Sequence, residues 1–202
     1  MSLHRLMTCI CVALFGVTLG CGGDGGTPVV EETAVEAENY FEVDAATAAT
    51  VSGTVTFEGE APRNPRINMS AEPDCHGLHN GAVRAQVAVV GEGGTLGNTL
   101  VWVKSGLEGK KFQTPKVPVA LDQKGCIYNP HGIALQTRQT LKGSNSDPTT
   151  HNVHPLPKVN REWNKSQTAN APAIERKFSR QEIMLPVKCN IHPWMRSYIN
   201  VV

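Results

Sequence analysis

The sequence predicts an all-β fold, a β-sandwich or barrel formed by residues 50–202. Several short segments alternate apolar and polar residues, and turn signals rich in Gly, Pro, Asn and Ser separate them. No long stretch repeats apolar residues at the period of a helix. The chain has 202 residues, a hydrophobic fraction of 40% and a charged fraction of 18%. These values suit a globular protein of one domain with extensions, or at most two small domains.

The N-terminus is typical of an export signal. Arg5 supplies a positive charge, and residues 6–19 form an apolar run that is too short to predict a membrane-spanning helix. Residues 17–21, Val-Thr-Leu-Gly-Cys, resemble a bacterial lipoprotein cleavage site. The resemblance implies that residues 1–20 are removed and that Cys21 is lipidated, which would anchor the protein to a membrane of the cell envelope. The alternative is ordinary secretion with a free N-terminus.

Residues 21–49 are expected to be a flexible acidic tether. Residues 21–48 carry seven Asp or Glu and no Lys or Arg, and they are rich in small residues that bury little apolar area. Residues 49–202 carry eighteen Lys or Arg against eleven Asp or Glu. This positive balance favours acidic partner proteins or anionic surfaces. The basic residues are scattered, so nucleic-acid binding is not expected.

Eight segments after the tether are strand candidates. Residues 51–57, Val-Ser-Gly-Thr-Val-Thr-Phe, alternate as a half-buried strand does, and Gly59 to Pro62 end them. Residues 159–176 are polar and are expected to form a loop with a short helix. The other candidates are residues 85–90, 99–103, 117–121, 133–137, 139–142, 182–188 and 197–202.

The cysteines are expected to have different roles. Two of the six leave with the signal and Cys21 is the lipidation candidate, so three remain. An odd number in an oxidising compartment implies one thiol with another function. A disulfide between Cys75 and Cys126 would leave Cys189, which lies among metal-ligand residue types. The alternative is a second metal site, formed by Cys75 with His76, His79 or His131.

Residues 186–202 contain Cys189, His192 and Met195, each three residues after the last. Prolines at two positions oppose a helix here, and β-type residues flank the segment. The segment is therefore expected to form a tight loop between two strands. Such a loop turns a thiolate, an imidazole and a thioether toward one point.

This set of ligand types favours copper. Thiolate and thioether are soft ligands, and two His with one Cys and a long axial Met make the blue-copper arrangement. Zinc is the main chemical alternative, but Met is not a zinc ligand. The second imidazole must come from elsewhere in the fold, and residues 151–154, His-Asn-Val-His, offer two.

The stretch His151-Asn-Val-His154, with Cys189, His192 and Met195 at their spacing, resembles the cupredoxins, the amicyanin-type and plastocyanin-like members most closely. The resemblance covers about residues 130–202. It implies a Greek-key β-sandwich that holds one type 1 copper ion. It also implies that His151 is the ligand and that His154 lies nearby but unbound.

The resemblance further implies roles for the neighbours of the ligands. Asn152 would tie the two ligand loops together and donate a backbone hydrogen bond to the thiolate. His192, with Pro193 and Trp194, would be the ligand at the solvent edge through which electrons pass. Ile191 stands where amicyanin-type loops carry a Pro, so its N–H is available for a further hydrogen bond to the sulfur.

The expected function is that of a monomeric one-electron carrier in the cell envelope, acting with redox partner proteins. The alternatives are a copper-binding and delivery module in metal homeostasis, and a structural interaction domain. An enzyme is not expected, because four protein ligands leave no open position for a substrate. The chain also lacks a recognisable hydrolase or nucleotide-binding motif.

Overall fold

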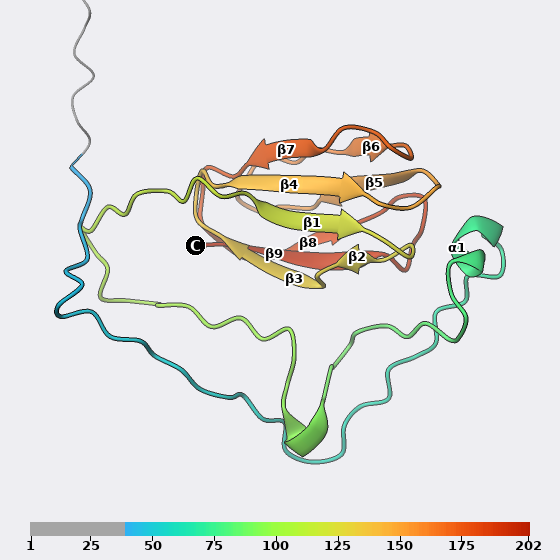
Figure 1. The fold of residues 1–202 in the computed structure, drawn as a ribbon, viewed down its shortest axis with the longest axis horizontal. Coiled ribbons are helices and arrows are strands. Elements are labelled where there is room, and N and C mark those ends of the chain that lie inside the picture. Colours follow the sequence, from blue (N-terminus) through green and yellow to red (C-terminus); the bar gives the residue numbers. More distant parts are fainter. Residues whose placement is uncertain (1–38) are drawn as a thin grey trace, which may run out of the picture. The chain divides into compact units, whose positions relative to one another are not determined.

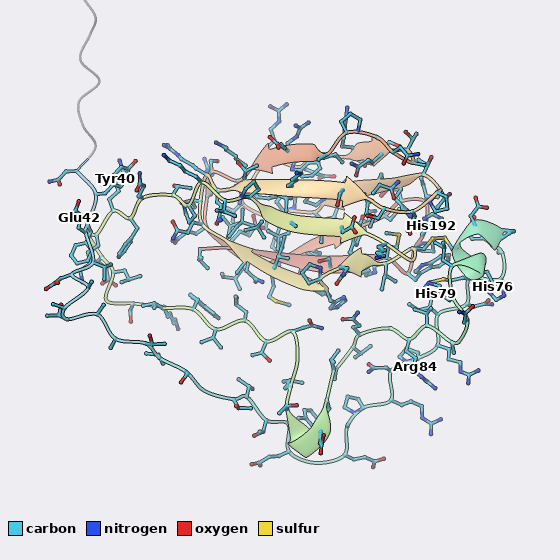
Figure 2. The ribbon with its side chains drawn as sticks, viewed as in Figure 1. Tyr40, Glu42, His76, His79, Arg84 and His192 are labelled. Atoms are coloured by element: carbon cyan, nitrogen blue, oxygen red, sulfur yellow. A yellow bond between two sulfur atoms is a disulfide. The ribbon has the colours of Figure 1, made fainter. Side chains whose placement is uncertain are left out.

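The computed structural model describes residues 39–202 (Figure 1). The predicted signal peptide, residues 1–20, and the lipidation candidate Cys21 lie outside the described residues, as does the tether up to residue 38. The described end of the tether includes Tyr40 and Glu42 and contains no strand or helix (Figure 2). Within residues 39–202, no helix has the length and apolar character needed to cross a membrane.

The strands of residues 39–202 form a two-layered β-sandwich (Figure 1). Two of its strand pairs, β1–β4 and β3–β9, are parallel, and the other pairs are antiparallel. The predicted all-β sandwich is therefore confirmed. In spatial order, one sheet contains β2 (Tyr128–Asn129), β1 (Val119–Gln123), β4 (Thr140–Asn145) and β7 (Ile174–Lys177); the other contains β3 (Gly132–Leu135), β9 (Arg196–Val201), β8 (Glu182–Lys188), β5 (His151–Pro155) and β6 (Lys165–Gln167).

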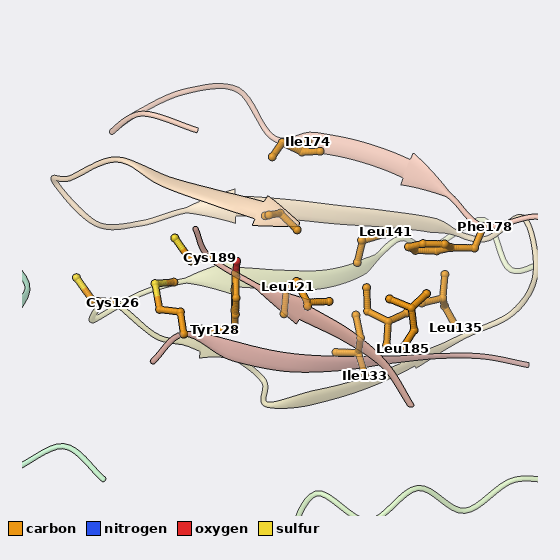
Figure 3. Close-up of a cluster of buried hydrophobic side chains, with 14 of the residues drawn as sticks. Leu121, Cys126, Tyr128, Ile133, Leu135, Leu141, Ile174, Phe178, Leu185 and Cys189 are labelled. Atoms are coloured by element: carbon orange, nitrogen blue, oxygen red, sulfur yellow. The ribbon is translucent and has the colours of Figure 1, made fainter. Parts of the chain in front are cut away.

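The core lies between the two sheets (Figure 3). Alternate residues of a strand point to opposite faces, so each strand contributes every second side chain to the core. Ile133 and Leu135 on β3, and Leu185 and Val187 on β8, are buried in this way. Each such side chain contributes about 1.5–3 kcal/mol to folding by leaving water. This packing fixes the ends of β5 and β8, from which the candidate site is formed.

Five of the predicted strands are confirmed with small shifts at their ends. Residues 117–121, 133–137, 139–142, 182–188 and 197–202 correspond to β1, β3, β4, β8 and β9. The loop and short helix predicted for residues 159–176 are wrong, because this segment contains β6 and the start of β7. β6 is short and polar and shows no apolar alternation. Its strand conformation comes from pairing with β5.

Three predicted strands, residues 51–57, 85–90 and 99–103, are not strands in the structure. Residues 51–57 and 85–90 make only isolated bridges, Thr56 to Thr95 and Val90 to Leu96. Val51 is 98% exposed, and Val101, in the third segment, is 79% exposed. Alternation predicts the face of a strand, but a strand also needs a continuous hydrogen-bonded neighbour. These segments have none among the described residues.

Candidate metal centre

The ends of β5 and β8 and the loop before β9 bring three of the predicted ligands together, and the fourth, Met195, lies on the same loop. His151 is the first residue of β5, and Cys189 directly follows β8, which pairs with β5. His192 and Met195 belong to the loop that leads into β9. Two backbone hydrogen bonds close this loop, from Cys189 N–H to the Met195 carbonyl (3.3 Å) and from Met195 N–H to the His192 carbonyl (3.0 Å). All four side chains are buried.

Three potential donor atoms converge in this buried space. His151 Nδ1 and His192 Nδ1 are 2.9 Å apart, and Cys189 Sγ is 3.9 Å from His192 Nδ1. The donor atoms of these three residues lie within 4.8 Å of one another. Met195 is fully buried in the same loop. The three donors can hold one metal ion between two imidazoles and a thiolate, and Met195 lies on the same loop as two of them.

Asp147 holds the ring of His151, a role that sequence reasoning missed. Its Oδ2 lies 2.9 Å from His151 Nε2. A carboxylate accepts, so Nε2 carries the proton and Nδ1 presents its lone pair to the centre. Burial lowers the pKa of His151, but the contacts with Asp147 and Cys189 outweigh it and raise that pKa overall. The available signal was the position of Asp147, four residues before His151.

Asp147 is itself fixed by consecutive backbone N–H groups. Gly125 donates to Oδ1 (2.6 Å) and Cys126 donates to Oδ2 (2.7 Å). Both residues have positive φ, 68° and 52°, and both of their N–H groups bind the same carboxylate. Burial raises the pKa of Asp147, but its hydrogen bonds with His151, Cys126 and Gly125 lower that pKa overall.

Backbone N–H groups surround the sulfur of Cys189. His192 N–H donates to Sγ at 3.5 Å. Burial raises the pKa of the thiol, but the nearby His151 ring and hydrogen bonds from the N–H groups of His192, Asn152 and Ile191 lower it overall. Asn152 Oδ1 lies 3.3 Å from Sγ and accepts the Asn190 N–H (2.8 Å), so it links β5 to the ligand loop. The N–H donors favour the thiolate that a soft metal binds.

His154 has partners outside this cluster. Its Nδ1 lies 2.9 Å from Asn190 Oδ1, and its Nε2 lies 2.6 Å from Glu162 Oε1. Both ring nitrogens of His154 are therefore engaged. The structure directs His151, and not His154, toward Cys189 and His192.

His192 differs from the expectation of a ligand at the solvent edge, because it is only 2% exposed. Its ring lies 5.3 Å from that of Trp194, whose Nε1 donates to the Cys126 carbonyl. Figure 2 shows His192 at the end of the sandwich that faces α1 (Pro73–Gly77). The sequence alone does not reveal that α1 lies on this side of His192, because α1 precedes His192 by more than a hundred residues. Ile191 and Pro193, on either side, are exposed.

Cys75 and Cys126 form a disulfide, and Cys189 is the free cysteine of the described residues. The histidines considered for a second metal site have other contacts or lie on the surface. His79 Nε2 lies 2.8 Å from the Gly125 carbonyl, and the His131 ring packs edge-on against Tyr198. Among residues 39–202, no group of three close metal donors includes His76, His79 or His131.

Comparison with known proteins gives matches among solved structures only. No family model and no curated protein matches the chain. It is similar to a copper-containing nitrite reductase from Thermus scotoductus (18% identity, TM-score 0.40, 46% of this chain and 24% of that chain). This chain therefore spans about a quarter of the reductase.

Two smaller proteins are also similar. They are a reduced amicyanin variant (19% identity, TM-score 0.38) and a purple cupredoxin from Nitrosopumilus maritimus (19%, TM-score 0.33). The matches cover 42% and 38% of this chain, and 82% of each of those chains.

Proposed function

We propose that the chain is a one-electron carrier that holds one copper ion at a type 1 site through His151, Cys189, His192 and Met195. The observation that carries the proposal is the buried convergence of two imidazole Nδ1 atoms and a thiol sulfur, with a buried Met on the same loop. Bound copper would supply a centre that alternates between two oxidation states one electron apart.

The donor set fits copper better than the common alternatives. Two imidazoles, a thiolate and a thioether suit copper, whereas zinc does not take Met as a ligand. The Asp147 contact orients His151 before any metal binds, and the N–H groups around Cys189 favour its thiolate. The residues are therefore arranged for the ion in advance, which keeps structural change between redox states small.

The same geometry supports a carrier over an enzyme or a delivery module. The four protein donors leave no position for a substrate, which catalytic metal sites keep open. Burial of all four side chains favours retention of the ion over its release to a partner. We further propose that the protein is monomeric, is anchored through Cys21 in the cell envelope and exchanges electrons with acidic partner proteins, in keeping with the basic balance of residues 49–202.

The optical and EPR spectra of the copper-loaded domain test this function. The oxidised protein should bind one equivalent of copper and show an intense visible thiolate-to-copper band. Cys189→Ser should abolish the band, because a hydroxyl does not replace the soft anionic donor. Met195→Leu should retain the colour and shift the reduction potential. Copper binding without the visible band would contradict the carrier and favour the homeostasis module.

A further inference from the structure

Residues 69–79, which we call the cap, lie over the His192 side of the candidate centre. They include α1, whose Cys75 is fully buried, and Met69, which packs in the same buried cluster as Met195. A ring nitrogen of His192 lies within 4.8 Å of the sulfur atoms of both Cys75 and Cys126. The cap and its disulfide therefore lie directly against His192.

The turn of Gly125 and Cys126 anchors the cap. Cys126 forms the disulfide with Cys75, and the Gly125 carbonyl lies 2.8 Å from His79 Nε2. The two surfaces fit closely at Gly125, where a Cβ would come within 2.9 Å of the His79 ring. The positive φ of Gly125 also disfavours any larger residue. One covalent bond, one polar contact and the buried side chain of Met69 thus hold the cap.

The same turn also contacts the metal-ligand residues. Its two N–H groups bind Asp147, which orients His151, and the Cys126 carbonyl accepts the Trp194 Nε1 proton next to His192. A movement of the cap would be transmitted by the disulfide. It would therefore act on His192 through Trp194 and on His151 through Asp147. Trp194 and Asp147 therefore connect the cap to the site.

We propose that the disulfide-held cap is a positioning element that closes the His192 side of the metal centre to water and to small external ligands such as azide. The proposal rests on the proposed function for the identity of the metal, but the closure itself is a property of the metal-free fold. A closed hydrophobic surround controls the access of solvent to a metal site and hence its ligand set. The Cys75–Cys126 bond is what keeps that surround in place.

The metal-free protein provides the first test, by NMR with a neutral, soluble gadolinium chelate that broadens exposed protons. In the wild type, the ring protons of His192 and His151 should both be protected, while those of exposed His76 broaden. In the Cys75→Ala, Cys126→Ala double variant, His192 should broaden as well, whereas His151 should stay protected. A His192 that remains as protected as His151 in the double variant would overturn the proposal.

Two controls keep this result interpretable. Asp74→Ala changes an exposed cap residue and leaves the disulfide in place, so His192 should stay protected. If the double variant does not fold, reduction of the folded wild type by a phosphine gives the same comparison without substitution. His192 should then become accessible on reduction, and unchanged protection with both thiols free would overturn the proposal.

The copper-loaded protein provides a second test, by titration with azide followed in the visible spectrum. A cap that opens about a tenth of the time raises the apparent dissociation constant of an external ligand about tenfold. The double variant should therefore respond at an azide concentration at least about tenfold lower than the wild type does. Equal responses of the double variant and the wild type would contradict the proposed closure by the cap. A protein that binds no copper would contradict the proposed function alone, since the metal-free comparison stands without it.

Discussion

His151 and His154 lie three residues apart on β5, yet their surroundings differ. Side chains at an odd spacing point to opposite faces of a strand, so only one of the two can join a centre on the buried face. His151 points to Cys189 and His192, and His154 points to Asn190 and Glu162. The resemblance implied this choice, and the period of a strand would have supported it if residues 151–155 had been predicted as a strand.

Replacement of each histidine separates the two roles. His151→Ala should abolish the visible copper band, because one of the two imidazole donors is lost. His154→Ala should leave the band intact, because this ring contacts only side chains outside the donor cluster. Absorption spectra of both variants at one equivalent of copper provide the measurement. If His154→Ala loses the band and His151→Ala keeps it, the ligand assignment is wrong.

Asp147 should tune the affinity for copper without being a ligand. Asp147→Asn weakens the hold on His151 Nε2 and places an amide opposite the N–H groups of Gly125 and Cys126. Loss of such an outer contact typically lowers metal affinity by about 10–100-fold. Competition with a chelator measures the change. The control is Asp122→Asn, which alters a carboxylate bonded to Ser144 and Ser146, and equal affinities of the two variants would refute the role of Asp147.

At the scale of elements, alternation predicted strands that pack in the core but not those formed by pairing. Apolar alternation marks β8 and β9, which lie next to the ligand loop, and both were predicted with nearly correct ends. β5, β6 and β7 were missed, because polar residues such as His, Asn, Lys and Glu fill them. Their strand conformation comes from the ladder with their neighbours, which single-sequence patterns do not contain.

Glu182, the first residue of β8, joins this strand to the loop after β5. Its carboxylate accepts N–H groups of Lys158, Val159 and Asn160. Burial raises the pKa of Glu182, but these bonds and the Asn160 side chain lower it below the usual 4.5. A lowered folded-state pKa means that the stabilisation is complete above the unfolded pKa and is lost as the pH falls through the folded one.

Glu182→Gln should therefore destabilise the protein in a pH-dependent way. The free energy of unfolding in urea should fall by on the order of 1 kcal/mol at neutral pH. The difference from the wild type should shrink as the pH falls below about 4.5 and the wild-type carboxylate protonates. Glu175→Gln, at an exposed position of β7, is the matched control. A constant difference between wild type and Glu182→Gln from neutral to acid pH would contradict the role of the charge.

At the scale of the whole molecule, the described chain divides into a sandwich and the residues before it. Every strand of residues 39–202 lies between residues 119 and 201, and the described residues before them contribute α1, a short 3₁₀ turn and isolated bridges. The Cys75–Cys126 disulfide links this preceding segment to the sandwich across a sequence separation of 51. The thiol count favoured this pairing, but nothing in the sequence indicated that the bond lies beside His192.

Loss of the disulfide should lower stability as a closed loop of this length predicts. The chain-entropy model gives about 4 kcal/mol for a loop of roughly fifty residues. The Cys75→Ala, Cys126→Ala variant should show a fall of this order in its free energy of unfolding. A reductant should produce a similar fall in the wild type and no further fall in the variant. An unchanged stability would mean that the preceding segment is uncoupled from the folding of the sandwich.

X-ray absorption at the copper edge of the loaded wild type tests the central claim most directly, because it reports the atoms bound to the metal. We expect one short bond to a sulfur and two bonds to imidazole nitrogens, which is the trigonal set of a type 1 site. The short sulfur bond should disappear in Cys189→Ser. A coordination shell of nitrogen and oxygen alone in the wild type, or a short sulfur bond that persists in Cys189→Ser, would contradict the site proposed for this chain.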